Sequence, residues 1–176
     1  MKEINFLNTT EDEIENGIKD EFGGIYSADG KRLLKFENGD LKEYSIKEGT
    51  VYICHGAFEY SNLKKINIPD GVTHIGNEAF RRTKIKEIIL PDSVKDIGSS
   101  AFYRCTSLTS IVIPDSVRSI GNYTFEKCTD LTTVVIPDSV TVIGDHAFDN
   151  CTSLTSILFD GTVAQWSGIT KGYKSA

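Results

Sequence analysis

Apolar residues recur along this chain with a period of 22 or 23 residues. The period is clearest at phenylalanine, because Phe58, Phe80, Phe102, Phe125 and Phe148 are 22, 22, 23 and 23 residues apart. A period of this length, kept over several repeats, is typical of a solenoid in which each repeat buries its apolar face against the next. The pattern therefore predicts a stack of coils.

Other positions keep nearly fixed distances from each phenylalanine and define one unit, V-x-x-I-G-x-x-A-F-x-x-C-x-x-L-x-x-I-x-I-P-D-S. The L-x-x-I-x-I part ends in an alternation of period 2 that is rich in β-branched residues, which predicts a short strand. Proline ends this strand because it cannot donate to a continuing ladder. V-x-x-I-G predicts a second short extended piece, with a backbone bend at glycine.

The pentapeptide LPDSV at residues 90–94 has three further copies, at 68–72, 113–117 and 136–140. Pro-Asp suits positions i+1 and i+2 of a type I turn, and the following Ser or Gly suits i+3. The four copies are thus interpreted as one corner of the coil and not as four sites. Calcium is the alternative for the stacked acids, but one carboxylate per coil supplies too few ligands. The acids of this column are Asp70, Asp92, Asp115 and Asp138.

A helix is predicted over residues 10–21, before the first coil. Thr10 and Glu13 form a capping-box pattern, and Ile14, Ile18 and Phe22 would share one face. We expect this helix to cover the first coil; a separate partner-binding helix is the alternative.

The unit resembles the 23-residue leucine-rich repeat of the BspA-like family, from about residue 24 to residue 169. IYSADGKRLLKF, within residues 24–44, resembles the longer, hairpin-bearing first repeat of that family. FDGTVAQWSGI resembles its terminal repeat, with Val163 in the valine column and Trp166 in the isoleucine column. Trp166 is expected to cover the last open coil, since solenoids need caps.

The resemblance implies a β-rich α+β solenoid, a right-handed leucine-rich repeat stack of about five to six coils. An N-terminal helix and hairpin would cap one end, and a tryptophan-containing segment would cap the other. The expected parts are a helical cap segment at 1–23, an irregular first repeat at 24–50, regular repeats at 51–159, and a capping repeat and tail at 160–176.

Charge is unevenly distributed and argues against nucleic acid as a partner. The net charge is -6; residues 1–50 hold 12 acids and 7 bases, leaving 13 acids and 12 bases in residues 51–176. This near-neutral body has no basic footprint for a phosphate backbone. Six bases fall within residues 64–86, but acids lie among them, so a solvated face is expected. No apolar stretch is long enough for membrane insertion.

Cysteine offers no metal or redox motif. Cys105, Cys128 and Cys151 share one column of the repeat, and Cys54 stands alone. None has C-x-x-C spacing, so zinc is not expected, and small buried thiols are predicted instead.

Histidine offers no ligand ladder, because His55, His74 and His146 occupy three different phases of the repeat. The chain also lacks the phosphate-binding, nucleophile-elbow and zinc-protease motifs. No catalytic residue, metal or cofactor is therefore expected, and the chain is predicted not to be an enzyme.

The candidate binding positions are those that point outward from the L-x-x-I-x-I strands, since the inward ones form the core. The first outward column is Lys65, Glu87, Ser110, Thr133 and Ser156. The second outward column is Asn67, Ile89, Val112, Val135 and Leu158. Aliphatic side chains in the second column predict a protein-binding stripe, with strand propensity as the equal alternative. A homo-oligomer could use the same stripe.

Two functions remain open at this stage. The resemblance implies a cell-surface or secreted bacterial adhesin-type protein that binds a host or neighbouring-cell protein. An intracellular scaffold or self-associating repeat protein is the alternative, favoured by the absence of a signal sequence before residue 22. Location is left undecided between these two.

Overall fold

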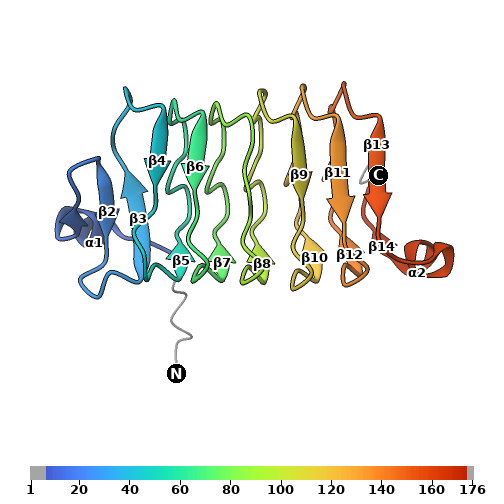
Figure 1. Ribbon diagram of the computed structural model, residues 1–176, viewed down its shortest axis with the longest axis horizontal. Coiled ribbons are helices and arrows are strands. Elements are labelled where there is room, and N and C mark those ends of the chain that lie inside the picture. Colours follow the sequence, from blue (N-terminus) through green and yellow to red (C-terminus); the bar gives the residue numbers. More distant parts are fainter. Residues whose placement is uncertain (1–6, 174–176) are drawn as a thin grey trace.

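A computed structural model describes residues 7–173 as a rod of stacked coils (Figure 1). The chain runs from one end of the rod to the other, with α1 (Glu11–Glu15) and α2 (Val163–Gly168) at opposite ends. The rod is a β-solenoid of about six turns with little helix, which confirms the predicted fold class.

Most coils contribute short strands to two parallel rows along the rod. The first row consists of β4 (Glu43–Ser45), β6 (Lys65–Asn67), β9 (Ser110–Val112), β11 (Thr133–Ile136) and β13 (Ser156–Phe159). The second row consists of β5 (Tyr52–Ile53), β7 (His74–Ile75), β8 (Asp96–Ile97), β10 (Ser119–Ile120), β12 (Val142–Ile143) and β14 (Thr170–Lys171). Partners lie one repeat apart, so that Val134 pairs with both Ile111 and Ile157.

An antiparallel hairpin begins the stack, formed by β2 (Gly24–Tyr26) and β3 (Arg32–Phe36). The short strand β1 (Ile18–Lys19) pairs with β2 on its outer side, and β3 pairs in parallel with β5. The hairpin thereby converts the antiparallel start of the chain into the parallel stacking of the coils.

The phenylalanine column forms the centre of the core. From Phe58 to Phe148, neighbouring rings stack nearly parallel, with centroids 5.2–5.4 Å apart and interplanar angles of 6–13°. All five side chains are buried. One ring per coil therefore gives a continuous aromatic stack along the axis.

Two left-handed residues flank the Ala-Phe pair in each regular coil. In the coil of Phe102 they are Ser100 (φ 57°) and Arg104 (φ 57°). Such φ values are unfavourable for residues other than glycine. These residues make successive backbone amides point in different directions. Phe102 N–H donates to the Thr124 carbonyl of the next coil (3.0 Å), whereas Ala101 N–H donates to the Gly98 carbonyl of its own coil (3.3 Å). The coil-to-coil hydrogen bonds thus compensate a strain that the sequence pattern did not reveal.

The N-terminal helix α1 ends at residue 15 and not at residue 21. Its predicted capping box is present, because Glu13 N–H donates to Thr10 Oγ1 (3.1 Å) and Thr10 N–H donates to the Glu13 carboxylate (3.0 Å). Ile14 packs on a small cluster that contains Leu34 and Cys54.

The predicted apolar helix face of Ile14, Ile18 and Phe22 is wrong. Ile18 lies in β1, and the side chains of Ile18 and Phe22 are about half exposed. A Cβ on Gly17 would lie 2.4 Å from Ile25 Cγ2. This close approach to β2 shows that the chain turns here into the sheet instead of continuing as a helix.

The proline corners are shifted by one residue from the prediction. Val72 N–H donates to the Pro69 carbonyl (3.1 Å) and Val117 N–H to the Pro114 carbonyl (3.0 Å), so proline occupies position i of the turn. The serine at i+2 has a role between coils, since Ser139 Oγ donates to the Val117 carbonyl one coil earlier (2.7 Å).

Glycine recurs at one position of the repeat because the coils stack closely there, and not because the backbone bends as predicted. Gly76, Gly98 and Gly144 have no positive φ. A Cβ on Gly98 would lie 2.5 Å from Asn77 N and 2.6 Å from the Gly76 carbonyl carbon. Glycine is therefore required because the preceding coil leaves no room for a side chain.

The C-terminal segment also departs from the prediction. Val163 and Trp166 lie on α2 and not in the valine and isoleucine columns, and Val163 is 84 % exposed. Lys171 takes the isoleucine column, paired with Ile143. The Trp166 ring lies 5.3 Å from the Phe159 ring and packs against the edge of the core. The outer limits of the proposed terminal parts, residues 1–6 and 174–176, lie outside the described residues.

The cysteine column forms a ladder of thiol hydrogen bonds, and none of the four cysteines forms a disulfide. Cys105, Cys128 and Cys151 each donate to the carbonyl of a phenylalanine one coil earlier, at 3.0–3.1 Å. Burial raises the pKa of Cys105 and of Cys151 to about 11, and raises that of Cys128 well above its usual value. Cys105 and Cys128 are buried thiols, as predicted, whereas Cys151 is half-buried.

We predict that glycine is replaceable only where the coils leave space. Gly98→Ala should lower the free energy of unfolding by about 1–3 kcal/mol, because its Cβ overlaps backbone. Gly121→Ala should cost less, since its nearest neighbour would be at 3.1 Å, and Gly39→Ala should be nearly neutral in open space. Urea unfolding of the three variants tests the order. A Gly98→Ala protein as stable as the parent would contradict the close stacking.

We predict that the thiol column makes the fold sensitive to alkali. The raised thiol pKa values mean that the folded chain keeps protons which the unfolded chain releases above its ordinary cysteine pKa. The free energy of unfolding should therefore be complete below pH about 9 and fall towards pH about 11. Cys105→Thr, which copies Thr83 in the same column, should reduce this slope. Equal slopes for the two proteins, measured by urea unfolding from pH 8 to pH 10, would refute the assignment.

Candidate functional site

The ten candidate positions lie together on one surface of the rod, which we call the strand face: the outward residues of β4, β6, β9, β11 and β13 and of residues 86–90. The register aligns the two predicted columns, because Thr133 pairs with Ser110 and Ser156. Val135 likewise pairs with Val112 and Leu158.

The apolar column of the strand face is open to solvent. Ile89 is 85 % exposed, Val112 60 % and Leu158 52 %, while Val135 is half-buried. Asn67 is exposed at the N-terminal end of the column, where its amide donates to Ser45 Oγ (2.9 Å). The column therefore changes from polar to aliphatic along the rod.

The other outward column changes from charged to hydroxyl-bearing residues. Lys65 and Glu87 are exposed at one end, and Ser110 and Thr133 continue the column at the other. Side chains beside these positions stiffen the C-terminal part, since Thr132 Oγ1 donates to the Thr109 carbonyl (3.0 Å) in the preceding coil. The two halves of the face thus differ in chemistry.

The strand predicted for residues 85–90 does not form. Lys86 N–H donates to the Lys64 carbonyl (3.2 Å) and the Lys86 carbonyl accepts from Thr109 N–H (3.0 Å). Beyond these bonds, no backbone hydrogen bond joins residues 87–90 to either neighbouring coil within residues 7–173. The first row of strands is therefore interrupted between β6 and β9.

The second row is interrupted directly after residues 86–90 along the chain, between β8 and β10, although β8 still pairs with β7. Gly144 N–H donates to the Ile120 carbonyl (2.8 Å) and Gly98 N–H to the Ile75 carbonyl (2.9 Å), but the described chain has no equivalent bond from Gly121 to Ile97. The interruption lies where the repeat becomes one residue longer: Ile85 is five residues after Phe80, whereas Leu108 is six residues after Phe102. Coil length and ladder continuity change together.

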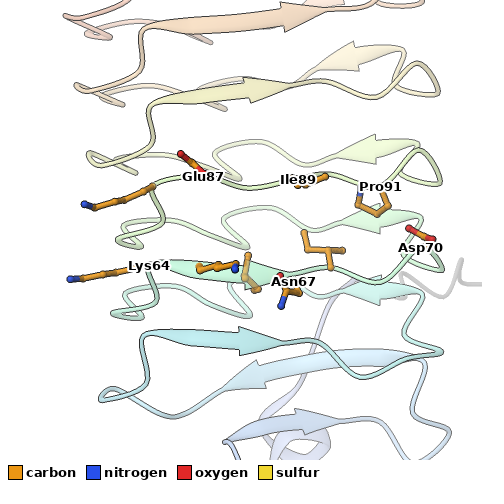
Figure 2. A pocket seen from close by; sticks show the side chains of 10 residues that line it. Lys64, Asn67, Asp70, Glu87, Ile89 and Pro91 are labelled. Atoms are coloured by element: carbon orange, nitrogen blue, oxygen red, sulfur yellow. The ribbon is translucent and has the colours of Figure 1, made fainter.

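A hollow of about 500 Å³ lies on the strand face at this interruption. Lys64 stands at one end, and Asp70 and Pro91 stand at the other (Figure 2). Ile89 and Asn67 lie between these ends, and Glu87 lies on the same segment as Ile89. The hollow therefore combines an exposed apolar side chain with separated charges.

Sequence reasoning missed part of this surface. Glu43 and Ser45 of β4 extend the two outward columns by one coil, and Lys42, Lys64 and Lys86 form a third column beside them. The signal was present, because these lysines are 22 residues apart and each follows a residue of the leucine column.

The histidines are held by local contacts of different kinds. His74 Nε2 lies 3.0 Å from Asp96 Oδ2, and the His146 ring stacks on Tyr123 at 5.2 Å. Burial lowers the pKa of His55. Among residues 7–173, no three His, Cys, Asp or Glu side chains gather as they would around a metal ion.

The turn acids and the helices add no further site. Asp70, Asp92, Asp115 and Asp138 are exposed at the corners, one per coil. Neither helix in the described part of the chain has the length and apolar character needed to cross a bilayer.

Solved structures with the same fold come from bacterial leucine-rich repeat proteins. One from Eubacterium ventriosum ATCC 27560 is 27 % identical with a TM-score of 0.75, over 81 % of this chain and 39 % of that one. The pneumococcal vaccine antigen PcpA is 23 % identical with a TM-score of 0.76, over 85 % and 38 %. The leucine-rich repeat protein of T. pallidum is 23 % identical with a TM-score of 0.64, over 94 % and 86 %.

This chain thus spans about two fifths of the length of the first two of these structures. The likenesses at 23 % identity show the fold alone. Comparison with curated protein sequences gives no match.

The repeat pattern itself is the stronger finding. The BspA type leucine-rich repeat region matches residues 35–167 in six copies, which is most of the chain. Leucine-rich repeats of this kind are generally non-enzymatic scaffolds and indicate a protein-interaction module. The chain belongs to the BspA-type leucine-rich repeat family.

Proposed function

We propose that this chain is a non-enzymatic module of a cell-surface or secreted bacterial adhesin-type protein, and that it binds a protein of the host or of a neighbouring cell through the strand face. The observation that carries the proposal is the exposed aliphatic column of Ile89, Val112 and Leu158. Contiguous exposed apolar surface with a polar border is typical of interaction sites.

Two members of this column argue against strand propensity as its whole explanation. Ile89, the most exposed of its members, lies in a segment without strand hydrogen bonds, where a β-branched residue gains nothing from a ladder. Leu158 is not β-branched, yet it is half exposed on β13. The core does not need either side chain, because Leu90 and Ile157 of the same segments provide the inward contacts.

The neighbouring hydroxyls favour a protein partner over a lipid surface. Ser110 and Thr133 lie one residue before Ile111 and Val134 on the same strands, beside the aliphatic column. A mixed surface of aliphatic and hydroxyl side chains supplies both apolar burial and hydrogen bonds, as protein interfaces do. The adhesin assignment rests on the family resemblance and on the bacterial origin of the similar structures.

We predict that charge on the aliphatic column abolishes binding. Val112→Lys/Leu158→Lys should weaken binding to a panel of extracellular-matrix proteins at least tenfold, because two lysines would have to be desolvated at the interface. The control is Val142→Lys/Val163→Lys, which places the same two charges at exposed valines outside the strand face. Surface plasmon resonance measures both, with thermal unfolding as the test of folding.

The proposal fails if both double variants bind as the parent does, or if the parent binds no matrix protein. Light scattering on the same samples distinguishes self-association. A parent protein that is oligomeric, with only Val112→Lys/Leu158→Lys monomeric, would assign the column to contact between copies instead.

A further inference from the structure

We propose that the N-terminal half of the strand face binds an acidic, amphipathic peptide segment of the partner protein. The site is the hollow at the ladder interruption together with the column of Lys42, Lys64 and Lys86, which we call the basic hollow. This inference rests on the proposed function and names the chemistry of the partner at one part of the face.

The lysine column places like charges side by side. Lys64 N–H donates to the Lys42 carbonyl (2.7 Å) and Lys86 N–H to the Lys64 carbonyl (3.2 Å), so the three residues occupy equivalent places in neighbouring coils. All three side chains are exposed, and no acid of residues 7–173 forms a salt bridge with them. Like charges opposite each other weaken a ladder.

The solenoid does not need lysine at this position. In the later coils the same place is taken by Thr109, Thr132 and Thr155, whose hydroxyls donate to the carbonyl one coil earlier at 3.2, 3.0 and 3.4 Å. Threonine therefore adds hydrogen bonds between coils, whereas lysine adds repulsion. A column that costs stability where a stabilising alternative fits is best explained by a ligand.

The apolar part of the basic hollow determines the kind of ligand. Ile89 is 85 % exposed, and Ile68 and Pro91 line the hollow together with it. An apolar side chain placed there would cover Ile89 without displacing a core residue. An acidic polysaccharide has anionic groups but no aliphatic side chain, so the surface fits a peptide better.

The charges of the basic hollow are separated along its length. Lys64 lies at the end opposite Asp70 (Figure 2). Lys65 and Lys84 add to the basic end, while Asp40, Glu43 and Glu87 reduce its charge. The basic end then has five lysines against three acids, in a chain of net charge -6. A peptide is expected to place its acidic residues over this end and its apolar residue over Ile89.

Selection from a library of random twelve-residue peptides tests the inference without knowledge of the partner. Selected peptides should be enriched in Asp and Glu next to one or more aliphatic or aromatic residues. Lys64→Gln/Lys86→Gln should bind a selected, fluorescently labelled peptide at least tenfold more weakly, with an unfolding temperature unchanged or raised. The parent's affinity should fall as NaCl rises from 50 to 500 mM.

Lys31→Gln/Lys95→Gln is the matched control, because it removes two exposed lysines outside the strand face and should bind the peptide as the parent does. Selected peptides without acidic enrichment, or equal losses in both lysine variants, overturn the inference. Heparin that binds the parent and competes fully, while peptides that lack apolar residues bind equally well, would show a polyanion site instead.

The result separates this inference from the proposed function. Loss of matrix-protein binding in Val112→Lys/Leu158→Lys combined with failed peptide selection leaves the strand face as an interface and removes only the basic hollow. If peptides bind at the basic hollow while Val112→Lys/Leu158→Lys binds matrix proteins as the parent does, the basic hollow is supported and the aliphatic column is removed as the interface.

Discussion

The distance between neighbouring coils is the constraint on which the rest of the structure depends. Backbone hydrogen bonds between coils hold that distance close to the spacing of a parallel ladder. The phenylalanine rings stack at 5.2–5.4 Å because they share this spacing, and glycine is required at Gly98 because no Cβ fits within it. The left-handed residues and the thiol hydrogen bonds serve the same end, since both join a coil to its neighbour. The coil spacing also restricts function, because each column places similar side chains next to one another and does not bring different functional groups together.

A repeated coil therefore supports recognition better than catalysis. An active site needs unlike groups that converge, but the inward positions here are occupied by core residues and the aspartates of the proline corners lie singly, one per coil. The outward columns instead offer a long surface whose composition can change coil by coil without altering the fold. On this chain the surface changes from lysine and acid around β6 to hydroxyl and aliphatic residues on β9 to β13. One scaffold thus carries two surfaces of different character.

The sequence was enough to predict the period, the core columns and the two outward columns, because all of these follow from a repeat that recurs at nearly equal intervals. It was insufficient where contacts between coils or with the hairpin decide the conformation. The end of α1 depends on Gly17 against Ile25, and the role of Gly98 depends on Asn77 in the preceding coil. The missing strand at residues 87–90 could not be read from Ile88 or Leu90, whose apolar spacing is ideal for a strand. At the C-terminus, a helix with its own capping box at Thr162 took the place of the predicted repeat.

The coincident interruption of both strand rows divides the rod mechanically. Across this junction the chain keeps the bonds from Ser100 to Asn122 (2.9 Å) and from Phe102 to Thr124 (3.0 Å), together with the stacked rings of Phe102 and Phe125. These contacts lie on the phenylalanine side, while on the strand side the amide and the hydroxyl of Thr109 donate to the Lys86 carbonyl across the same junction (3.0 and 3.2 Å). A pulling force along the axis, such as a tethered cell would exert, would open the side opposite the aromatic stack first. We expect the rod to bend along residues 87–90 of the strand face, beyond the bonds from Thr109 to the Lys86 carbonyl.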